Sequence, residues 1–244
     1  MNPEQRSQLH GAETTISPST HILAIASGKG GVGKSTVTVN LAAALEALGY
    51  HIGILDCDVY GFSIPRMVGA DEMQPRVVEG KIMPVVTHGM KIISMGNFVR
   101  DNAPVIWRGP MLGKVLDQFL TDVNWGELDF LLLDLPPGTG DVALDVARLL
   151  PTSSLIIVTT PQQVAAGVAS RAGQMARRTD QRILGVVENM SAFICPDCGK
   201  KTTIFGEGGG SQLAQELGVP LLGQVPLTME ARVLGDQGIP AASV

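Results

Sequence analysis

One short glycine-rich segment, Ser27–Thr36 (SGKGGVGKST), constrains the fold of this chain more than any other feature. It matches the phosphate-binding pattern G-x-x-x-x-G-K-[ST]. An apolar run, Ile22–Ala26, precedes it and predicts a buried strand, while apolar residues recur at helical spacing from Val37 to Leu48 after it. Between a strand and a helix, the glycines let successive backbone N–H groups converge on an anion, and the helix N-terminus adds partial positive charge. The segment therefore predicts a phosphate cradle rather than an ordinary glycine turn.

Two later apolar runs end on acidic residues. His51–Asp56 predicts a second strand that leads into the cluster Asp56-Cys57-Asp58, and Phe130–Asp134 predicts another strand ahead of a loop with the sequence Leu-Pro-Pro-Gly. The carboxyl ends of such strands lie at the edge of the sheet that also carries the phosphate loop. An acidic residue there can simply cap a turn, but beside a phosphate cradle a carboxylate is typical of a Mg²⁺ site.

The rest of the chain alternates between strand and helix patterns, which predicts an α/β fold with a predominantly parallel sheet. Aromatic residues make up 4% of the chain and hydrophobic residues 45%, as expected for strands buried under helices. Residues 1–20 are predicted to be a flexible arm, 21–244 a single domain, and 238–244 a frayed end. The further predicted strands are 81–86 and 90–95 (a hairpin with one member in the sheet), 155–160, 183–189 and 220–225, and the predicted helices are 109–120, 164–178, 211–217 and 229–234.

Charge and composition narrow the class of protein. The formal net charge of −5 disfavours a general nucleic-acid-binding surface, which needs clustered Lys and Arg. No apolar run approaches the ~20 residues of a membrane-spanning helix, and no early apolar segment suggests a signal peptide. Three cysteines, an odd number, in such a chain predict a reducing, cytoplasmic location without disulfides.

Two of these cysteines form the segment Cys195-Pro196-Asp197-Cys198-Gly199, within a predicted insertion near 190–204. Cys-x-x-Cys before glycine makes a tight turn that aims two thiols at one point, as in zinc and iron–sulfur sites. Two thiolates supply half of a four-sulfur site, and the economical source of the other half is a second copy of the chain across a two-fold axis. A redox-active pair and a turn without metal are the alternatives. Cys57 is expected to be a core residue instead.

Together these segments resemble a known family. The additional lysine after the first glycine, Lys29, resembles the deviant Walker A motif of the group that contains the nitrogenase iron protein, MinD, ParA and ArsA. Within that group the chain is similar to the Mrp/ApbC (Nbp35-like) iron–sulfur carrier ATPases in Leu55–Gly61, Trp107–Met111, Asp134–Asp141 and Glu188–Gly199. The resemblance covers about 22–234 and implies a three-layer P-loop NTPase sandwich. Many bacterial members begin with a small additional domain where this chain has only a polar arm, which puts any function of that domain in question.

The resemblance implies three catalytic residues. Lys34 would bridge the β- and γ-phosphates of ATP, Lys29 would reach the phosphates of a partner subunit, and Asp58 would orient the attacking water. Asn189 resembles the amide that pairs with adenine, because its donor and acceptor can satisfy the base edge. The nucleotide-binding residues implied in this way are Gly28, Lys29, Gly30, Gly31, Val32, Gly33, Lys34, Ser35, Thr36 and Asn189.

The resemblance also implies two metal-containing sites. Ser35, Asp56 and Asp134 would surround Mg²⁺, the carboxylates largely through water, and Cys195 and Cys198 would hold a labile [4Fe–4S] cluster between two subunits. The implied function is an ATP-hydrolysing, homodimeric cluster carrier that serves apo-proteins and cluster assembly factors, without a membrane or nucleic-acid partner. Two alternatives remain: a spatial-organising ATPase of the MinD or ParA type, and an ATPase with a structural zinc site.

Overall fold

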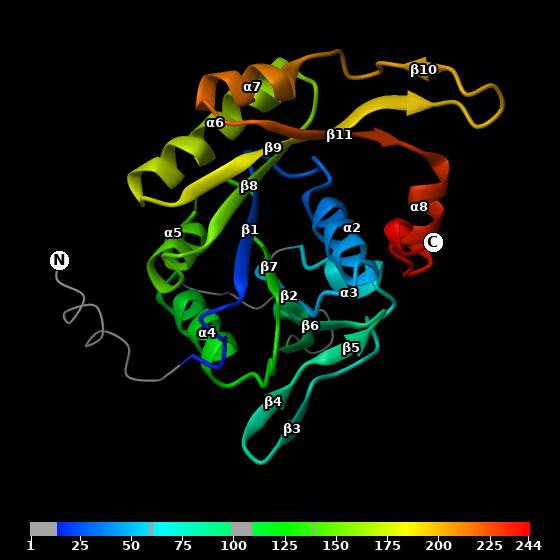
Figure 1. Cartoon of the computed structure of the whole chain (residues 1–244). Helices are drawn as coiled ribbons and strands as arrows, with labels where there is room; N and C mark the ends of the chain where they lie inside the picture. Colours follow the sequence, from blue (N-terminus) through cyan, green and yellow to red (C-terminus); the bar gives the residue numbers. More distant parts are fainter. Residues whose placement is uncertain (1–13, 59–60, 99–108, 139) are drawn as a thin grey trace.

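The computed structural model describes residues 14–58, 61–98, 109–138 and 140–244. Within them, nine strands form one sheet in the order β10-β9-β8-β1-β7-β2-β6-β5, and β11 pairs with β9 (Figure 1). Pairing is parallel except for β5 with β6 and β10 with β9. The strands of this sheet are β1 (His21–Ser27), β2 (Ile52–Asp56), β5 (Val85–Thr87), β6 (Met90–Ser94), β7 (Phe130–Asp134), β8 (Ser154–Thr159), β9 (Arg182–Ile194), β10 (Lys201–Thr202) and β11 (Leu221–Leu227).

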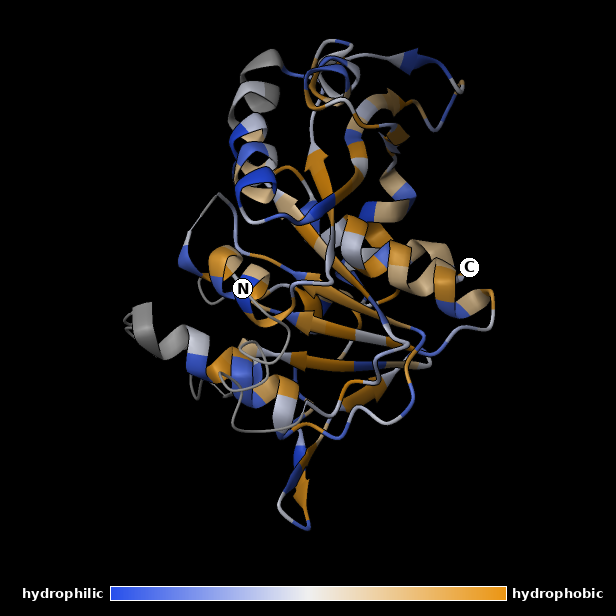
Figure 2. Cartoon of the chain, turned by 60° about the vertical axis from the view of Figure 1, so that its left-hand side comes forward, coloured by the Kyte–Doolittle hydropathy of each residue, from blue (hydrophilic) through white to orange (hydrophobic). Residues whose placement is uncertain are grey.

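Helices cover both faces of the sheet, so the molecule has three layers (Figure 1). The helices are α2 (Lys34–Ala47), α3 (Ile64–Met67), α4 (Gly109–Thr121), α5 (Asp141–Leu149), α6 (Gln163–Arg178), α7 (Gly209–Leu217) and α8 (Met229–Asp236). Neighbouring residues of a strand face opposite layers. In β7, Leu131 and Leu133 join the core under α4, α5 and α6, whereas Leu132 joins the core under α2 and α3. Strands buried on both faces are therefore apolar throughout, and Figure 2 shows them in the hydrophobic colour.

The predicted α/β sandwich with a predominantly parallel sheet is confirmed, but the prediction for residues 81–95 is wrong in detail. The run 81–86 divides at Pro84, which has no N–H to donate to a ladder. Its first part, β4 (Lys81–Met83), pairs with β3 (Arg76–Val78) in a separate two-stranded hairpin. Its second part, β5, joins the main sheet together with β6. Helix α5 was not predicted, because it begins directly after the Pro-Pro-Gly loop and is short.

The C-terminal end does not fray. Its last turn, η2 (Ala241–Ser243), lies against α2, where the Ala242 N–H donates to Asn40 Oδ1 at 2.9 Å. The Gly238 carbonyl contacts the His88 ring at 3.0 Å.

At the other terminus, residues 14–20 of the predicted arm contact the domain: the Thr15 N–H donates to the Leu120 carbonyl at 2.9 Å, and Ile16 is buried. Residues 1–13 lie outside the described residues. No described helix has the length and apolarity needed to cross a bilayer.

Because β7 lies in the middle of the sheet, shortening one of its buried side chains should strongly destabilise the fold. Leu132→Ala should lower the free energy of unfolding by about 2–5 kcal/mol, because Leu132 is 0% exposed and its loss leaves a cavity. Leu48→Ala is the matched control, since Leu48 is 74% exposed, and should change stability by no more than about 0.5 kcal/mol. Urea denaturation measures both, and similar midpoints for the two variants would contradict this core.

Candidate functional site

The glycine-rich segment forms a tight loop between the end of β1 at Ser27 and the start of α2 at Lys34. Gly31 and Gly33 have φ values of 79° and 78°, in the left-handed region that favours glycine. A Cβ on Gly33 would also overlap the Asn189 side chain. No described side chain caps the N-terminus of α2, so its first N–H groups are available to an anion in the loop. The predicted phosphate cradle therefore has the required backbone geometry.

A buried network holds the start of α2 against the end of β7. The Lys34 ammonium lies 2.7 Å from Asp134 Oδ2, and the two side chains are 6% and 0% exposed. Ser35 Oγ donates to Asp134 Oδ2 at 2.6 Å, and Thr38 Oγ1 donates to Asp134 Oδ1 at 2.7 Å. The Ser35 hydroxyl and the Asp134 carboxylate are oxygen ligands of the kind that Mg²⁺ prefers, and they lie side by side. These residues fit a magnesium ion at the mouth of the loop.

The second acidic strand end lies directly beside the first. Asp56 of β2 is in register with Asp134 of β7 and with Ser94 of β6. Asp56 Oδ2 accepts from Ser94 Oγ at 2.9 Å, and Asp56 Oδ1 accepts from the Asp58 N–H at 3.1 Å. Burial, followed by the charge of Asp134, raises the pKa of Asp56 to about 8, although the hydrogen bonds and Lys34 oppose this. The raised pKa favours the protonated, uncharged form of Asp56 at neutral pH.

Asp58 lies just past this strand end, in the position expected from the sequence. Its side chain is nearly buried, and its Oδ1 accepts from the Gly61 N–H at 3.2 Å. The residues that follow it, Val59 and Tyr60, lie outside the described residues, as do Trp107 and Arg108 of the Trp107–Met111 segment.

Lys29 and Val32 of the loop are each bonded to a residue far away in the sequence. The Lys29 ammonium donates to Gln162 Oε1 at 3.1 Å, immediately before α6. Asn189 is buried on β9, and its Nδ2 donates to the Val32 carbonyl of the loop at 2.9 Å. The structure therefore brings Asn189 to the phosphate loop across a sequence separation of 157 residues.

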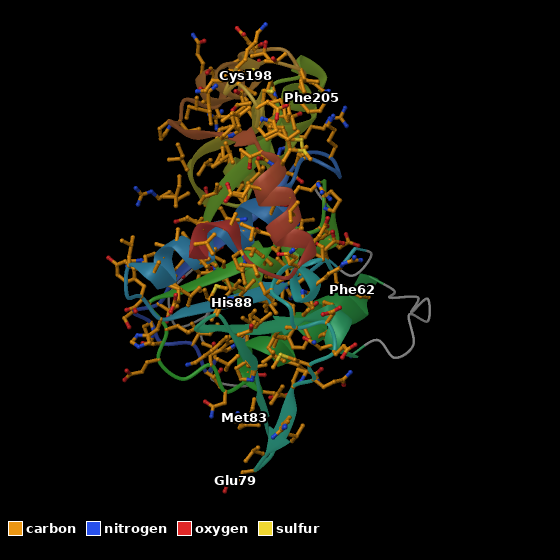
Figure 3. The ribbon with its side chains drawn as sticks, turned by 90° about the vertical axis from the view of Figure 1, so that its right-hand side faces the viewer. Phe62, Glu79, Met83, His88, Cys198 and Phe205 are labelled. Atoms are coloured by element: carbon orange, nitrogen blue, oxygen red, sulfur yellow. The ribbon has the colours of Figure 1, made fainter. Side chains whose placement is uncertain are left out.

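The two cysteines of the Cys-x-x-Cys segment lie in the turn between β9 and β10. The Cys195 N–H donates to the Lys200 carbonyl at 3.1 Å, and the Gly199 N–H donates to the Cys195 carbonyl at 2.9 Å. Cys195 is half-buried and Cys198 is exposed, and Figure 3 shows Cys198 at the end of the molecule opposite the β3–β4 hairpin. Hydrogen bonds from the backbone N–H groups of Cys198 and Asp197, and from the Cys198 thiol, lower the pKa of Cys195. A lowered pKa favours the thiolate, which is the form that binds metals.

The third cysteine is a core residue, as expected. Cys57 is buried and lines a small apolar cavity with Met95, Leu116, Phe119 and Val142, and burial raises its pKa. Among the described residues, no group of three or more His, Cys, Asp or Glu side chains is arranged to hold a metal ion. Within one described chain, Cys195 and Cys198 therefore form an incomplete ligand set for a four-coordinate site.

Three site residues were missed by the sequence analysis. Thr38 is four residues after Lys34 on α2, so helical spacing could have placed it beside the phosphate loop. Ser94 and Gln162 offered no such signal. Ser94 reaches Asp56 only because β6 lies next to β2, and Gln162 reaches Lys29 only because α6 begins above the loop.

A parallel sheet with a glycine-rich loop, a buried lysine at the helix start and acidic ends on the neighbouring strands defines a P-loop NTPase. Comparison with known proteins gives the same class. The chain belongs to the ParA family described as NUBPL iron-transfer P-loop NTPases, whose model matches residues 19–244.

Several relatives share most of this chain. It is 56% identical over 227 residues to an iron-sulfur cluster carrier protein of Mycobacterium leprae, covering 91% of this chain and 59% of that protein. It is 50% identical over 223 residues to a protein of the same name from Methanocaldococcus jannaschii, covering 90% and 77%. The chain thus spans about three-fifths of the M. leprae protein.

Solved structures show the same fold. A nucleotide-binding protein from Archaeoglobus fulgidus in complex with ADP has a TM-score of 0.80 at 39% identity, covering 90% of this chain and 87% of that one. The cell division ATPase MinD of Pyrococcus furiosus has a TM-score of 0.66 at 24% identity, which supports the fold alone.

The raised pKa of Asp56 predicts a pH-dependent contribution to stability. An ordinary Asp loses its proton near 3.8, whereas folded Asp56 keeps it up to about 8, so the folded state binds more protons between these values. The contribution of Asp56 to stability is therefore present at low pH and is lost as the pH rises through this window. Asp56→Asn removes the titration. Relative to wild type, the variant should therefore be more stable, with a higher free energy of unfolding, at about pH 8 than at about pH 5.

Urea denaturation in EDTA without nucleotide measures this difference. The exposed Asp117→Asn is the control, and its difference from wild type should stay constant with pH. A constant difference for Asp56→Asn as well would show that Asp56 ionises normally in the folded protein.

Proposed function

We propose that this chain is an ATP-hydrolysing carrier that holds an iron–sulfur cluster between two copies of itself and transfers it to apo-proteins. The observation that carries the proposal is the strand β9, which supplies both Asn189 to the phosphate loop and the Cys195/Cys198 turn just beyond its end. One chain thus joins a nucleotide cradle to an incomplete thiolate site. Its membership of an iron-transfer P-loop NTPase family supports the same function.

In the proposed nucleotide site, the phosphates of ATP are surrounded by the residues of the glycine-rich loop, which are Gly28, Lys29, Gly30, Gly31, Val32, Gly33, Lys34, Ser35 and Thr36. The phosphates offer Lys34 a second anionic partner besides Asp134, and Ser35 and the strand-end carboxylates hold magnesium, Asp56 and Asp134 largely through water. Magnesium, when bound, neutralises charge on the phosphate oxygens. Asp58 orients the attacking water, and Asn189 pairs with the adenine edge.

The proposed carrier is a homodimer for two independent reasons. Lys29 is bonded to Gln162 rather than to the Lys34–Asp134 pair, which suits a lysine that acts on a partner's phosphates. The thiol pair supplies two of the four ligands that a cluster of the [4Fe–4S] type needs, and a second copy supplies the others. The cluster is cargo that passes to client proteins or comes from assembly factors, in the reducing cytoplasm, without a membrane or nucleic-acid partner.

Anaerobic reconstitution with ferrous iron and sulfide tests the cluster site. Wild type should gain a thiolate-to-iron absorbance band with about four iron atoms per dimer, and Cys195→Ala and Cys198→Ala should lose it. Cys57→Ala is the matched control and should keep the band, because Cys57 is buried in the core. A full band in Cys195→Ala would refute this site.

Metal analysis of protein purified without oxygen distinguishes the proposed iron–sulfur carrier from the alternative of an ATPase with structural zinc. Iron with sulfide supports the carrier, while zinc alone supports a structural metal site. ATP-dependent sedimentation with liposomes or DNA would instead indicate a spatial-organising ATPase.

A mixing experiment tests whether Lys29 acts across the dimer. Lys29→Ala and Lys34→Ala should each abolish ATP hydrolysis as homodimers. In a mixed dimer, the Lys29→Ala subunit keeps its own Lys34 and receives Lys29 from its partner, so one of two sites is complete. Random mixing should therefore restore about a quarter of wild-type hydrolysis. An unrestored mixture of verified mixed dimers would show that Lys29 acts within its own subunit.

A further inference from the structure

Strand β9 is interrupted between Asn189 and the cysteine turn. Met190 has φ of 56°, a left-handed conformation that is unusual and costly for a residue other than glycine. The pairing with β11 shifts at the same place, because Val225 pairs with Asn189 and Leu227 pairs with Phe193. Two steps along β11 therefore match four steps along β9, and residues 190–192 form a bulge. Pro226, which faces this bulge, has no N–H with which to bridge it.

The part of β9 before the bulge is firmly held. It pairs with β8 on one side and β11 on the other. The Glu188 carboxylate is buried and accepts from the Gly210 N–H at the start of α7 and from Gln224 Nε2 of β11, both at 2.6 Å. After the bulge, β9 has only two paired residues: Phe193 pairs with Leu227 of β11 and Thr202 of β10, and Ile194, immediately before Cys195, pairs with Lys201 of β10. The bulge thus separates a fixed segment from the segment that carries the thiols.

The phosphate loop packs directly against this bulge. Asn189 donates to the Val32 carbonyl, and the position that a Cβ on Gly33 would take lies 3.6 Å from the Met190 Cε methyl. A change in the position of Val32 or Gly33 must therefore displace Asn189, Met190 or both, because packed groups do not deform continuously. Movement of Asn189 toward a nucleotide base would have the same effect, since its Nδ2 is bonded to Val32.

We propose that residues 190–192 form a joint that transmits the nucleotide state of the phosphate loop to the Cys195/Cys198 turn. The inference rests on the nucleotide site and thiol pair of the proposed function and adds the residue through which the two are connected. Met190 is a positioning residue: its side-chain methyl lies beside the position of Gly33 in the loop, and its left-handed backbone sets the direction in which β9 continues toward the cysteines. A small shift at the loop changes this direction, and with it the accessibility of the thiols.

The rate of thiol alkylation tests the joint without any metal. The metal-free, reduced protein is treated with iodoacetamide, and modification of Cys195 and Cys198 is followed by mass spectrometry with and without saturating ADP or a non-hydrolysable ATP analogue. Nucleotide should change the wild-type rate by at least about fivefold, the lower end of typical coupling between sites. Met190→Gly relaxes the backbone and removes the side chain that lies beside Gly33, so the change in rate should fall below about twofold.

The chain offers a matched control for the backbone substitution. Asp180 has φ of 55° in the exposed turn before β9, remote from the loop, so Asp180→Gly makes the same relaxation elsewhere and should keep the full nucleotide effect. Met190→Ala is a second variant, which removes the side-chain contact with little change in backbone freedom and should also weaken the effect. Circular dichroism checks folding, and calorimetry checks that nucleotide still binds each variant.

Three results would overturn the joint: a wild-type rate that nucleotide does not change, an unchanged nucleotide effect in Met190→Gly, or an equal loss of the effect in Asp180→Gly. Failure of the proposed function is distinguishable, because loss of cluster binding on reconstitution leaves this assay valid. Absence of nucleotide binding in calorimetry of the wild type would refute the nucleotide site instead.

Discussion

The structure depends on one buried ion pair, between Lys34 at the start of α2 and Asp134 at the end of β7. A charge removed from water is costly unless a partner and hydrogen bonds compensate it, and here Ser35 and Thr38 supply the additional donors. The same carboxylate lies beside Asp56, whose raised pKa limits the negative charge at this edge. One network therefore joins helix α2 to two neighbouring strands and holds Lys34 where a phosphate would arrive.

The second constraint is the length of β9. Its 13 residues begin between β8 and β11 and continue to the cysteine turn, so Asn189, which bonds the phosphate loop, and the two thiols are connected by a single strand. A straight, fully paired strand would hold both ends rigidly. The left-handed Met190 and the shifted pairing with β11 interrupt it between the two sites. The fold thus combines a fixed nucleotide cradle with a thiol segment that is attached to the sheet less tightly.

Parts of this arrangement could be predicted because they depend on neighbours in sequence. The loop, the strand ends at Asp56 and Asp134, and the Cys-x-x-Cys turn each follow from local spacing. The broken strand at Pro84 was missed because the apolar pattern runs through it, although the proline itself was a signal. The docked C-terminal turn was missed for a different reason: its contact with Asn40 joins residues 202 positions apart, and no local pattern records such a contact.

The class of fold, the phosphate cradle, its acidic neighbours and the paired thiols all follow from the amino-acid sequence, because glycine conformation, strand burial and short loops are properties of adjacent residues. Which of these groups contact one another depends on the packing of strands and helices that are far apart in the sequence. Strand order places Ser94 next to Asp56, helix placement brings Gln162 to Lys29, and the path of β9 brings Asn189 to Val32 of the phosphate loop. Folding also sets the pKa of Asp56, since burial and the distance to a second carboxylate exist only once the chain is folded.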